Sequence, residues 1–191
     1  MDIDELISIV TLKKLEDNKF EGQNYKTVWG RIFGGQVLSQ SLHAAYQTVP
    51  ENRIAHSMHA YFILPGDLNE PVIYEVDNIR NGGSFTTRRV VAFQKGRAIF
   101  NMAASFQKDE EGFDHQIQMP NVLSPDLLLT DFEQAEKFKE ELAERYQIFL
   151  AAHPKVFDFK PVGTNIFLRK ENALPINHCW FRLKDKIDMP L

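Results

Sequence analysis

The segment QVLSQSLHAAYQTV, residues 36–49, decides the fold. Its apolar residues recur at helical spacing, and small or apolar neighbours widen this face until little of the helix surface is polar. The regularly spaced residues are Leu38, Leu42, Ala45 and Val49, and the neighbours that widen the face are Val37, Ser41 and Ala44. Pro50 stops the helix, because proline lacks the amide N–H that a helix interior requires. The pattern predicts a helix buried at the centre of a domain.

Shorter elements are predicted ahead of this helix. Residues 2–15 place Leu6, Ile9 and Leu12 on one side of a short helix, and residues 19–23 have strand character. Two adjacent glycines, Gly34 and Gly35, then permit a tight backbone path into the central helix.

Four segments after the helix alternate apolar and polar residues, which is typical of strands. They occupy residues 56–64, 72–79, 85–94 and 97–107, and glycine-containing turns join them. Connections this short make neighbouring strands antiparallel, so we expect a meander in chain order. The apolar surface of the helix is buried only if the sheet curls around it. The predicted fold class is therefore α+β, a hotdog fold in which an antiparallel sheet wraps a central helix.

The composition limits the possible classes of function. The 191 residues carry a net charge of −4, which gives no basic surface for nucleic acid or for an anionic membrane. The single cysteine, Cys179, excludes an internal disulfide and fits a reducing compartment. No apolar run is long enough for a membrane span, and the acidic start MDIDE does not resemble a signal peptide. We expect a cytoplasmic protein.

The pattern changes after residue 108. A charged and proline-containing stretch follows, and Thr130 with Glu133 then forms a capping box that opens a helix ending before Pro154. Strand character returns at residues 156–162, 165–169 and 179–183. We expect an N-terminal hotdog domain at 1–108, a linker with a helix at 109–155, and the beginning of a second, incomplete hotdog domain at 156–191.

Several motifs, in this order and at this spacing, resemble the acyl-CoA thioesterase II family. They are FGGQV at 33–37, HSMHAYFILPGD at 56–67, RNGGSF at 80–85 running into RRV at 88–90, AASFQ at 103–107, and Met119-Pro120. Each motif alone is weak, but their joint order makes chance agreement a poor explanation. The resemblance is strong over residues 15–120 and looser from 121 to 191.

The resemblance implies a tandem double hotdog enzyme that hydrolyses fatty acyl-CoA to free fatty acid and CoA in fatty acid metabolism. Acyl-CoA would bind between the two repeats. The family's catalytic Asp, Ser or Thr, and Gln belong to the second repeat and would lie beyond Leu191, so we assign the Asp to neither Asp185 nor Asp188. We therefore expect little hydrolysis by these residues alone. We also expect a homo-oligomer, because half of a double hotdog leaves an open sheet edge.

The first candidate substrate-binding residues are Gly34, Gly35 and Gln36. They lie where a helix N-terminus would offer free N–H groups and the positive end of the helix dipole to a thioester oxygen. The alternative is that the glycines only relieve crowding where the helix meets the sheet.

A second candidate group lies at the turn into the third strand, which the resemblance places along the acyl-CoA groove. It consists of Gly82, Gly83, Ser84 and Phe85, with Arg88 on the strand that follows. The alternative is an ordinary hairpin turn. Guanidinium groups bind phosphate in a bidentate manner, so four arginines could meet the phosphates of CoA, although a solvated strand face is the favoured role for each. They are Arg80, Arg88, Arg89 and Arg97.

His56 is a weak candidate catalytic residue. The resemblance places it at a position associated with catalysis, but no carboxylate partner is visible, which favours a structural role. Strict alternation puts His56 and His59 on opposite faces of a strand, so they cannot share a metal ion. We expect no metal and no cofactor, because neither the His and Cys spacing nor a glycine-rich phosphate loop indicates one.

Two other functions remain open. The first is a non-catalytic, acyl-CoA-binding or oligomerising hotdog module, which the position of the catalytic residues beyond Leu191 makes a serious alternative. The second is a hotdog enoyl-CoA hydratase, whose signature Asp and His after the helix start we do not find.

Overall fold

The computed structural model describes residues 1–27, 30–142, 144, 147–148, 156–163 and 175–187. The chain divides into two compact units, one formed by Ile7–Asp114 and the other by Met1–Leu6 with His115–Leu191. Each unit is described by itself. None of the helices in the described part of the chain combines the length and apolarity that crossing a bilayer requires.

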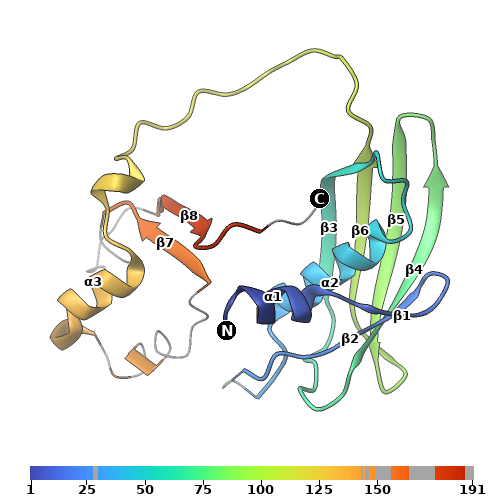
Figure 1. Ribbon diagram of the computed structural model, residues 1–191, viewed down its shortest axis with the longest axis horizontal. Coiled ribbons are helices and arrows are strands. Elements are labelled where there is room, and N and C mark those ends of the chain that lie inside the picture. Colours follow the sequence, from blue (N-terminus) through green and yellow to red (C-terminus); the bar gives the residue numbers. More distant parts are fainter. Residues whose placement is uncertain (28–29, 143, 145–146, 149–155, 164–174, 188–191) are drawn as a thin grey trace. The chain divides into compact units, whose positions relative to one another are not determined.

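A six-stranded antiparallel sheet forms most of the unit Ile7–Asp114 (Figure 1). In chain order its strands are β1 Lys13–Glu16, β2 Lys19–Gly22, β3 Ile54–Phe62, β4 Val72–Asn81, β5 Phe85–Gln94 and β6 Arg97–Gln107. Their order across the sheet is β1-β2-β4-β5-β6-β3. The helices are α1 Ile3–Val10 and α2 Gly34–Tyr46.

The predicted meander is correct for three strands and wrong for the fourth. β4, β5 and β6 pair in chain order, but β3 pairs with β6, where Ile54 lies across from Gln107 and Phe62 across from Phe100. The connection 63–71 therefore crosses from one edge of the β4-β5-β6 meander to the other. Alternation of apolar and polar residues identifies strands but does not show which strands pair with each other. The pattern therefore could not predict that β3 pairs with β6.

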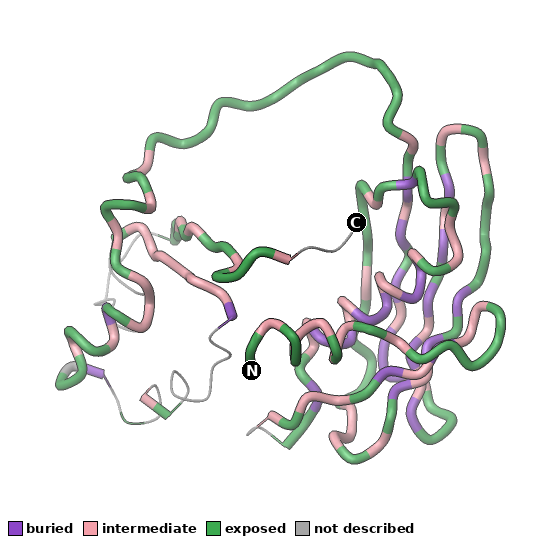
Figure 2. Tube along the Cα trace, viewed as in Figure 1, coloured by how far each residue is buried: buried purple, intermediate pink, exposed green. Residues whose placement is uncertain are grey.

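The central helix is confirmed. α2 packs on β4, β5 and β6, and none of its residues is classed as exposed. Ala44 and Ala45 are fully buried, which lets the helix approach the sheet closely. On β5 the buried row is Thr86, Arg88, Val90, Ala92 and Gln94, not the row of Phe85, Val91 and Phe93 that the apolar pattern favours. On β4 and β6 the core-facing residues are the expected alternating rows, seen as buried segments along the strands in Figure 2. They include Val72, Tyr74 and Val76 on β4, and Phe100, Met102, Ala104 and Phe106 on β6.

The turn between β5 and β6 has the form that its sequence predicts. Lys95 and Gly96 both have positive φ, 50° and 72°. Two consecutive left-handed residues match the right-handed twist of the flanking strands, so a two-residue turn joins the paired residues Gln94 and Arg97.

The predicted first helix is too long at its C-terminal end. Helix α1 stops at Val10, and residues 13–16 form β1 instead. Strand β1 pairs with β2, and Asn18 takes a positive φ of 63° in the turn between them. Sheet pairing thus overrides the helical spacing of Leu12.

In the other unit, helix α3 spans Asp131–Lys137 and begins with the predicted capping box. Thr130 Oγ1 accepts from the Glu133 N–H, and the Glu133 carboxylate accepts from the Thr130 N–H. Strands β7 Phe157–Pro161 and β8 Cys179–Leu183 pair antiparallel. The short 3₁₀ turns η1 and η2 occupy Pro125–Leu127 and Lys139–Glu141. The predicted strand at 165–169 lies outside the described residues, and the predicted domain boundaries stay predictions.

We predict that Phe106→Ala lowers the free energy of unfolding by roughly 3–5 kcal/mol, because it removes a fully buried ring from the core. The ring of Phe106 packs edge-to-face on Tyr46 of α2, with ring centroids 5.0 Å apart. Denaturant unfolding measures the loss. The control is Ile79→Ala at a side chain that is 54% exposed on the same sheet, for which a change under about 0.5 kcal/mol is expected. Equal losses in the two variants would contradict the assigned core.

Candidate functional site

The N-terminus of α2 is the first part of the candidate site. Helix α2 begins at Gly34 with Phe33 as its N-cap, and no side chain caps it. The Gln36 and Val37 amides donate to the Phe33 carbonyl, whereas the Gly34 and Gly35 amides have no acceptor among the described residues. Two N–H groups at the positive end of the helix dipole are therefore free.

Aromatic rings lie directly against these two glycines. A Cβ on Gly34 would lie 2.9 Å from the Phe62 ring, and one on Gly35 would lie 2.5 Å from the Phe33 ring. Both rings are more than 60% exposed. The close approach expected at the glycines is thus made by the protein's own rings, which supports the alternative that the glycines relieve crowding. The free N–H groups keep the binding interpretation open.

Gln36 does not face a ligand. Its side chain is 7% exposed and joins α2 to the segment that precedes it. Oε1 accepts from the Tyr25 N–H at 2.9 Å, and Nε2 donates to the Gln23 carbonyl at 3.1 Å and to Asn24 Oδ1 at 3.0 Å. Gln36 therefore positions residues 23–25 beside the helix start.

Gln40 continues this polar network one turn along α2. It donates to the Gln23 carbonyl at 2.9 Å and accepts from the Tyr74 hydroxyl at 2.6 Å. Burial raises the pKa of Tyr74, so its hydroxyl stays protonated and keeps donating. A side chain at position 22 would collide with this network, because a Cβ on Gly22 would lie 2.6 Å from Gln40 Oε1.

The turn between β4 and β5 is the second part of the candidate site, and a buried arginine holds it from beneath. Arg53 is 7% exposed, and its guanidinium donates to the carbonyls of Gly82 at 2.9 Å, Gly83 at 2.7 Å and Ser84 at 2.8 Å. Sequence patterning does not mark Arg53, which stands one residue before β3 and has no motif around it.

Arg88 has neither of the two roles considered for it, a phosphate contact or a place on a solvated strand face. It is 1% exposed and points into the core. Its guanidinium donates to Thr48 Oγ1 and the Thr48 carbonyl at 2.8 and 2.7 Å, to the carbonyls of Arg80 and Thr87, and to Asn81 Oδ1. These contacts use its donors, so a phosphate could reach Arg88 only if the core opened. Burial also lowers the pKa of Arg88 below its ordinary value.

The other three arginines differ in their surroundings. Arg80 is exposed, and its guanidinium lies over the turn, with Nε 3.2 Å from the position of a Cβ on Gly82. Arg89 forms an exposed ion pair with Asp77 at 3.0 Å. Arg97 is exposed at the opposite hairpin, between β5 and β6. Arg80 alone of these lies on the candidate turn.

His56 lies beside the same turn. Its Nε2 is 2.8 Å from Ser105 Oγ, and its ring meets the Phe85 ring edge-on with centroids 5.7 Å apart. Phe85 is 51% exposed, so these side chains form an accessible surface. Among the described residues no carboxylate contacts His56, and the pair with Ser105 lacks the third group that orients a catalytic histidine.

The prediction that His56 and His59 lie on opposite faces is wrong. The β3–β6 register shifts between Ala55, which pairs with Phe106, and Ser57, which pairs with Ser105. His56 is the extra residue of this bulge and reaches Ser105 on the face that Ser57 and His59 share. A one-residue bulge reverses the alternation that the prediction assumed. No group of three metal-ligating side chains occurs within the described residues.

The two parts of the candidate site lie at opposite ends of α2. Gly34–Gln36 form the first turn of α2. At the other end of the helix, Arg88 joins Thr48, which follows the last helical residue, to the β4–β5 hairpin. The helix has 13 residues, so at about 1.5 Å per residue its ends are about 20 Å apart. The structure therefore separates the predicted substrate-binding residues into two groups along one helix.

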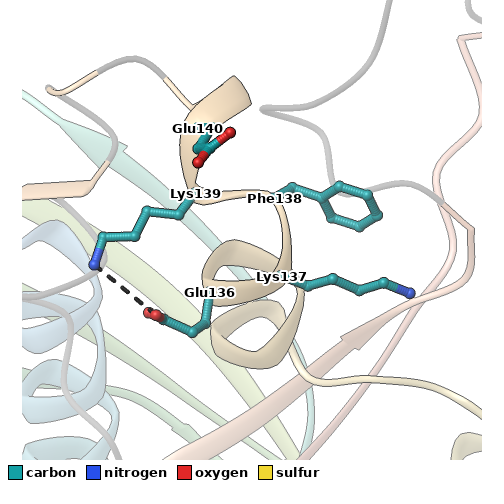
Figure 3. A pocket seen from close by; sticks show the side chains of 5 residues that line it. All are labelled: Glu136, Lys137, Phe138, Lys139 and Glu140. Atoms are coloured by element: carbon teal, nitrogen blue, oxygen red, sulfur yellow. Dashed lines mark ion pairs between the residues drawn. The ribbon is translucent and has the colours of Figure 1, made fainter.

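A hollow in the other unit offers no comparable chemistry. Five consecutive residues, Glu136–Glu140, line it at the end of α3 (Figure 3). Lys139 pairs loosely with Glu136 at 3.9 Å, and Lys137 Nζ lies 5.4 Å from the centre of the Phe138 ring. Solvated charges from one short stretch of chain do not converge on a bound molecule, so we assign no function to this hollow.

Comparison with known proteins gives these features a context. Residues 24–107 match the family model of the acyl-CoA thioesterase N-terminal domain. The chain is 41% identical over 142 residues to acyl-CoA thioesterase 2 of Haemophilus influenzae, a match that covers 74% of this chain and 50% of that protein. Through these residues the chain belongs to the acyl-CoA thioesterase II family.

Solved structures agree with this family and with the fold. An acyl-CoA thioesterase II from Mycobacterium marinum superposes with a TM-score of 0.70 at 34% identity, over 94% of this chain and 60% of that one. A hot dog fold protein from Alicyclobacillus acidocaldarius superposes with a TM-score of 0.70 at 18% identity, over 94% of this chain and 62% of that one. The second likeness shows the fold alone, and the hotdog prediction is confirmed. The chain spans 50% to 58% of the length of the first curated relatives it matches.

We predict that Gly82→Ala lowers the free energy of unfolding by roughly 1–3 kcal/mol, because the new Cβ would lie 2.6 Å from the Phe85 carbonyl oxygen. The neighbouring Gly83→Ala is a matched control. Its Cβ would meet nothing within 4 Å and its φ is not positive, so a change within about 0.5 kcal/mol is expected. Thermal or denaturant unfolding of both variants decides the question, and a neutral G82A would show that the turn is not held as described.

Proposed function

We propose that the protein to which this chain belongs is an acyl-CoA thioesterase, which hydrolyses fatty acyl-CoA to free fatty acid and CoA. The observation that carries the proposal is the match of residues 24–107 to the acyl-CoA thioesterase N-terminal domain, together with 41% identity to the Haemophilus thioesterase. Both groups of predicted substrate-binding residues fall inside this match. The proposed substrate, acyl-CoA, is a long molecule whose thioester and phosphates lie apart from each other. This suits two groups of binding residues at opposite ends of α2.

Thioester hydrolysis needs an activated water and a stabilised negative charge on the carbonyl oxygen. Within the described parts of the chain the Gly34 and Gly35 amides have no acceptor, and they lie at a helix N-terminus, which supports a role for them in binding the thioester oxygen. The family resemblance puts the Asp, Ser or Thr, and Gln that position the water beyond Leu191. In this proposal the N-terminal hotdog binds substrate and the residues that activate water come from the second repeat.

A non-catalytic module that binds acyl-CoA is the second candidate. The observation that favours it is the surroundings of His56, which has Ser105 as a partner but no carboxylate within the described residues. The same surface would then bind acyl-CoA without hydrolysing it.

We retain a cytoplasmic location as part of the proposal. It is supported by the presence of a single cysteine, which leaves no internal disulfide.

We also propose that the chain self-associates through β3. Among the strands that the structure describes, β3 is at the end of the sheet and has β6 as its one partner. Its apolar side chains are unusually accessible, with Ile54 60%, Met58 47% and Phe62 62% exposed. An accessible apolar edge strand is a template for pairing with another strand.

The enzymatic proposal predicts thiol release from acyl-CoAs by the complete open reading frame and little release by the 191-residue chain. The physical reason is that the second repeat supplies the groups that activate water. Release of free CoA from acyl-CoAs of several chain lengths measures both proteins side by side. Substantial turnover by residues 1–191 would show that the first repeat contains a hydrolytic site of its own. Absence of turnover with binding retained in both proteins would favour the non-catalytic module.

The proposed association predicts a dimer in sedimentation velocity experiments and a shift toward monomer in Met58→Lys, because a charge on an edge strand opposes strand pairing. Ile79→Lys is the matched control, since Ile79 is similarly exposed at 54% but lies on β4, which β5 and β6 separate from β3. A wild-type monomer, or equal dissociation in both variants, would contradict the role of β3.

A further inference from the structure

Of the described strands, β1 and β3 are at the two edges of the sheet, and they differ in how they oppose pairing with another strand (Figure 1). β1 has four residues, of which Lys13, Lys14 and Glu16 are charged, and its register with β2 shifts between Lys14 and Glu16. Short length, lysine and irregular pairing are common protections of an edge strand. β3 has nine residues and no lysine, arginine, aspartate or glutamate among them. β1 is therefore a protected edge, and β3 is a long edge that stays uncharged while its histidines are neutral.

His56 and His59 are the residues of β3 that can become positively charged. The bulge in β3 brings His56 Nε2 within 2.8 Å of Ser105 Oγ, and His59 pairs with Ala103 on the same face of the sheet. Regular alternation would have put the two rings on opposite faces. Both side chains are exposed, so two groups that accept protons lie together on the outer face of an edge strand.

The groups that face these two rings leave a proton on either ring without a bonded counter-charge. Arg89 on β5 lies across β6 from His59, because both residues pair with Ala103, and its own charge is paired with Asp77 at 3.0 Å. Exposed carboxylates at 109–111 follow β6 at the end where His56 lies, and they favour a charged imidazole there. The other neighbours are uncharged: Ser105 and Phe85 beside His56, and Tyr61 and Ala103 beside His59.

We propose that β3 pairs with β3 of a second copy of the chain, and that protonation of His56 and His59 controls this pairing. The inference rests on the self-association proposed above and not on the proposed hydrolysis. A second copy fits this edge because an uncharged strand meets its own copy without electrostatic repulsion. Met58 and Phe62 lie on the helix side of β3, opposite the core residues of β6, and the same apolar side chains of the partner would adjoin them.

Pairing brings the histidines of the two copies together. When two edge strands join antiparallel into one continuous sheet, the two-fold axis is perpendicular to the sheet, so the outer faces of both copies are on the same side. Four imidazoles, two from each copy, then lie on one face of neighbouring strands about 5 Å apart. Like charges across a strand pair are destabilising. The pair of strands is therefore stable with neutral imidazoles and weaker with protonated ones.

Acidification is expected to dissociate this pair. Because protons on the imidazoles oppose pairing, the dimer binds fewer protons than two separate copies. Association is thus strongest above the range in which histidine titrates, roughly pH 5 to 8, and is lost as the pH falls through it. The net charge acts in the opposite sense. It is −4 at pH 7 and becomes smaller in magnitude as protons are added, which lowers the general repulsion between copies.

The test is sedimentation equilibrium of the 191-residue chain at about pH 8 and about pH 5.5, at one ionic strength. The dissociation constant of the dimer is expected to be roughly tenfold higher at the lower pH. The double variant His56→Gln/His59→Gln keeps polar side chains that cannot be protonated, so it is expected to associate equally at both pH values. His59→Lys carries a charge at both pH values and is expected to associate weakly at both.

His115→Gln is the matched control, because His115 is exposed but lies outside the sheet; it is expected to keep the wild-type response to pH. Circular dichroism at both pH values verifies that each variant is folded. An unchanged wild-type dissociation constant, tighter association at the lower pH, or a response that persists in the double variant would overturn the control by histidine. A wild-type monomer at about pH 8 would reject the pairing itself. Thiol release by the complete protein tests the thioesterase separately from all of these outcomes.

Discussion

The burial of α2 against the sheet is the constraint on which the rest of the structure depends. Ala44 and Ala45 are fully buried and Val37 nearly so, and strands β4, β5 and β6 receive them with Tyr74, Val90 and Met102. Small residues on the helix let it lie close to the strands, so the sheet covers it with few gaps. Because the helix position is fixed in this way, its two ends become fixed points from which functional groups can be placed.

Two buried polar side chains of the helix, Gln36 and Gln40, are stabilised by specific partners. Gln36 and Gln40 would be costly to bury alone, but together with Tyr74 and the backbone of residues 23–25 they form a connected network. Arg53 and Arg88 follow the same rule with backbone carbonyls as acceptors. The network specifies where the segment before α2 runs, and the arginines specify the shape of the β4–β5 turn.

The sequence predicted what depends on local periodicity and missed what depends on long-range partners. The helix, the strands β4 to β6, the Lys95-Gly96 hairpin and the Thr130 capping box follow from spacing and turn chemistry, and all are found. Strand β3 crosses to the far edge, and its bulge moves His56 to the face of Ser105; neither can be inferred from alternation. Because arginine is rarely buried, Arg88 was expected at the surface, yet it lies in the core and two of its five hydrogen bonds go to Thr48, 40 residues away.

The two ends of α2 present opposite electrostatic conditions, and the buried arginines explain how both could meet an anionic molecule. The N-terminal end carries the positive end of the helix dipole and free amides at Gly34 and Gly35, so it favours negative charge without help. The C-terminal end carries the negative end of the dipole and would repel phosphate. Arg88 donates to the Thr48 carbonyl beyond the last turn of the helix, and Arg53 lies under the adjacent hairpin. The full positive charges of these two arginines oppose the partial negative charge at this end of the helix.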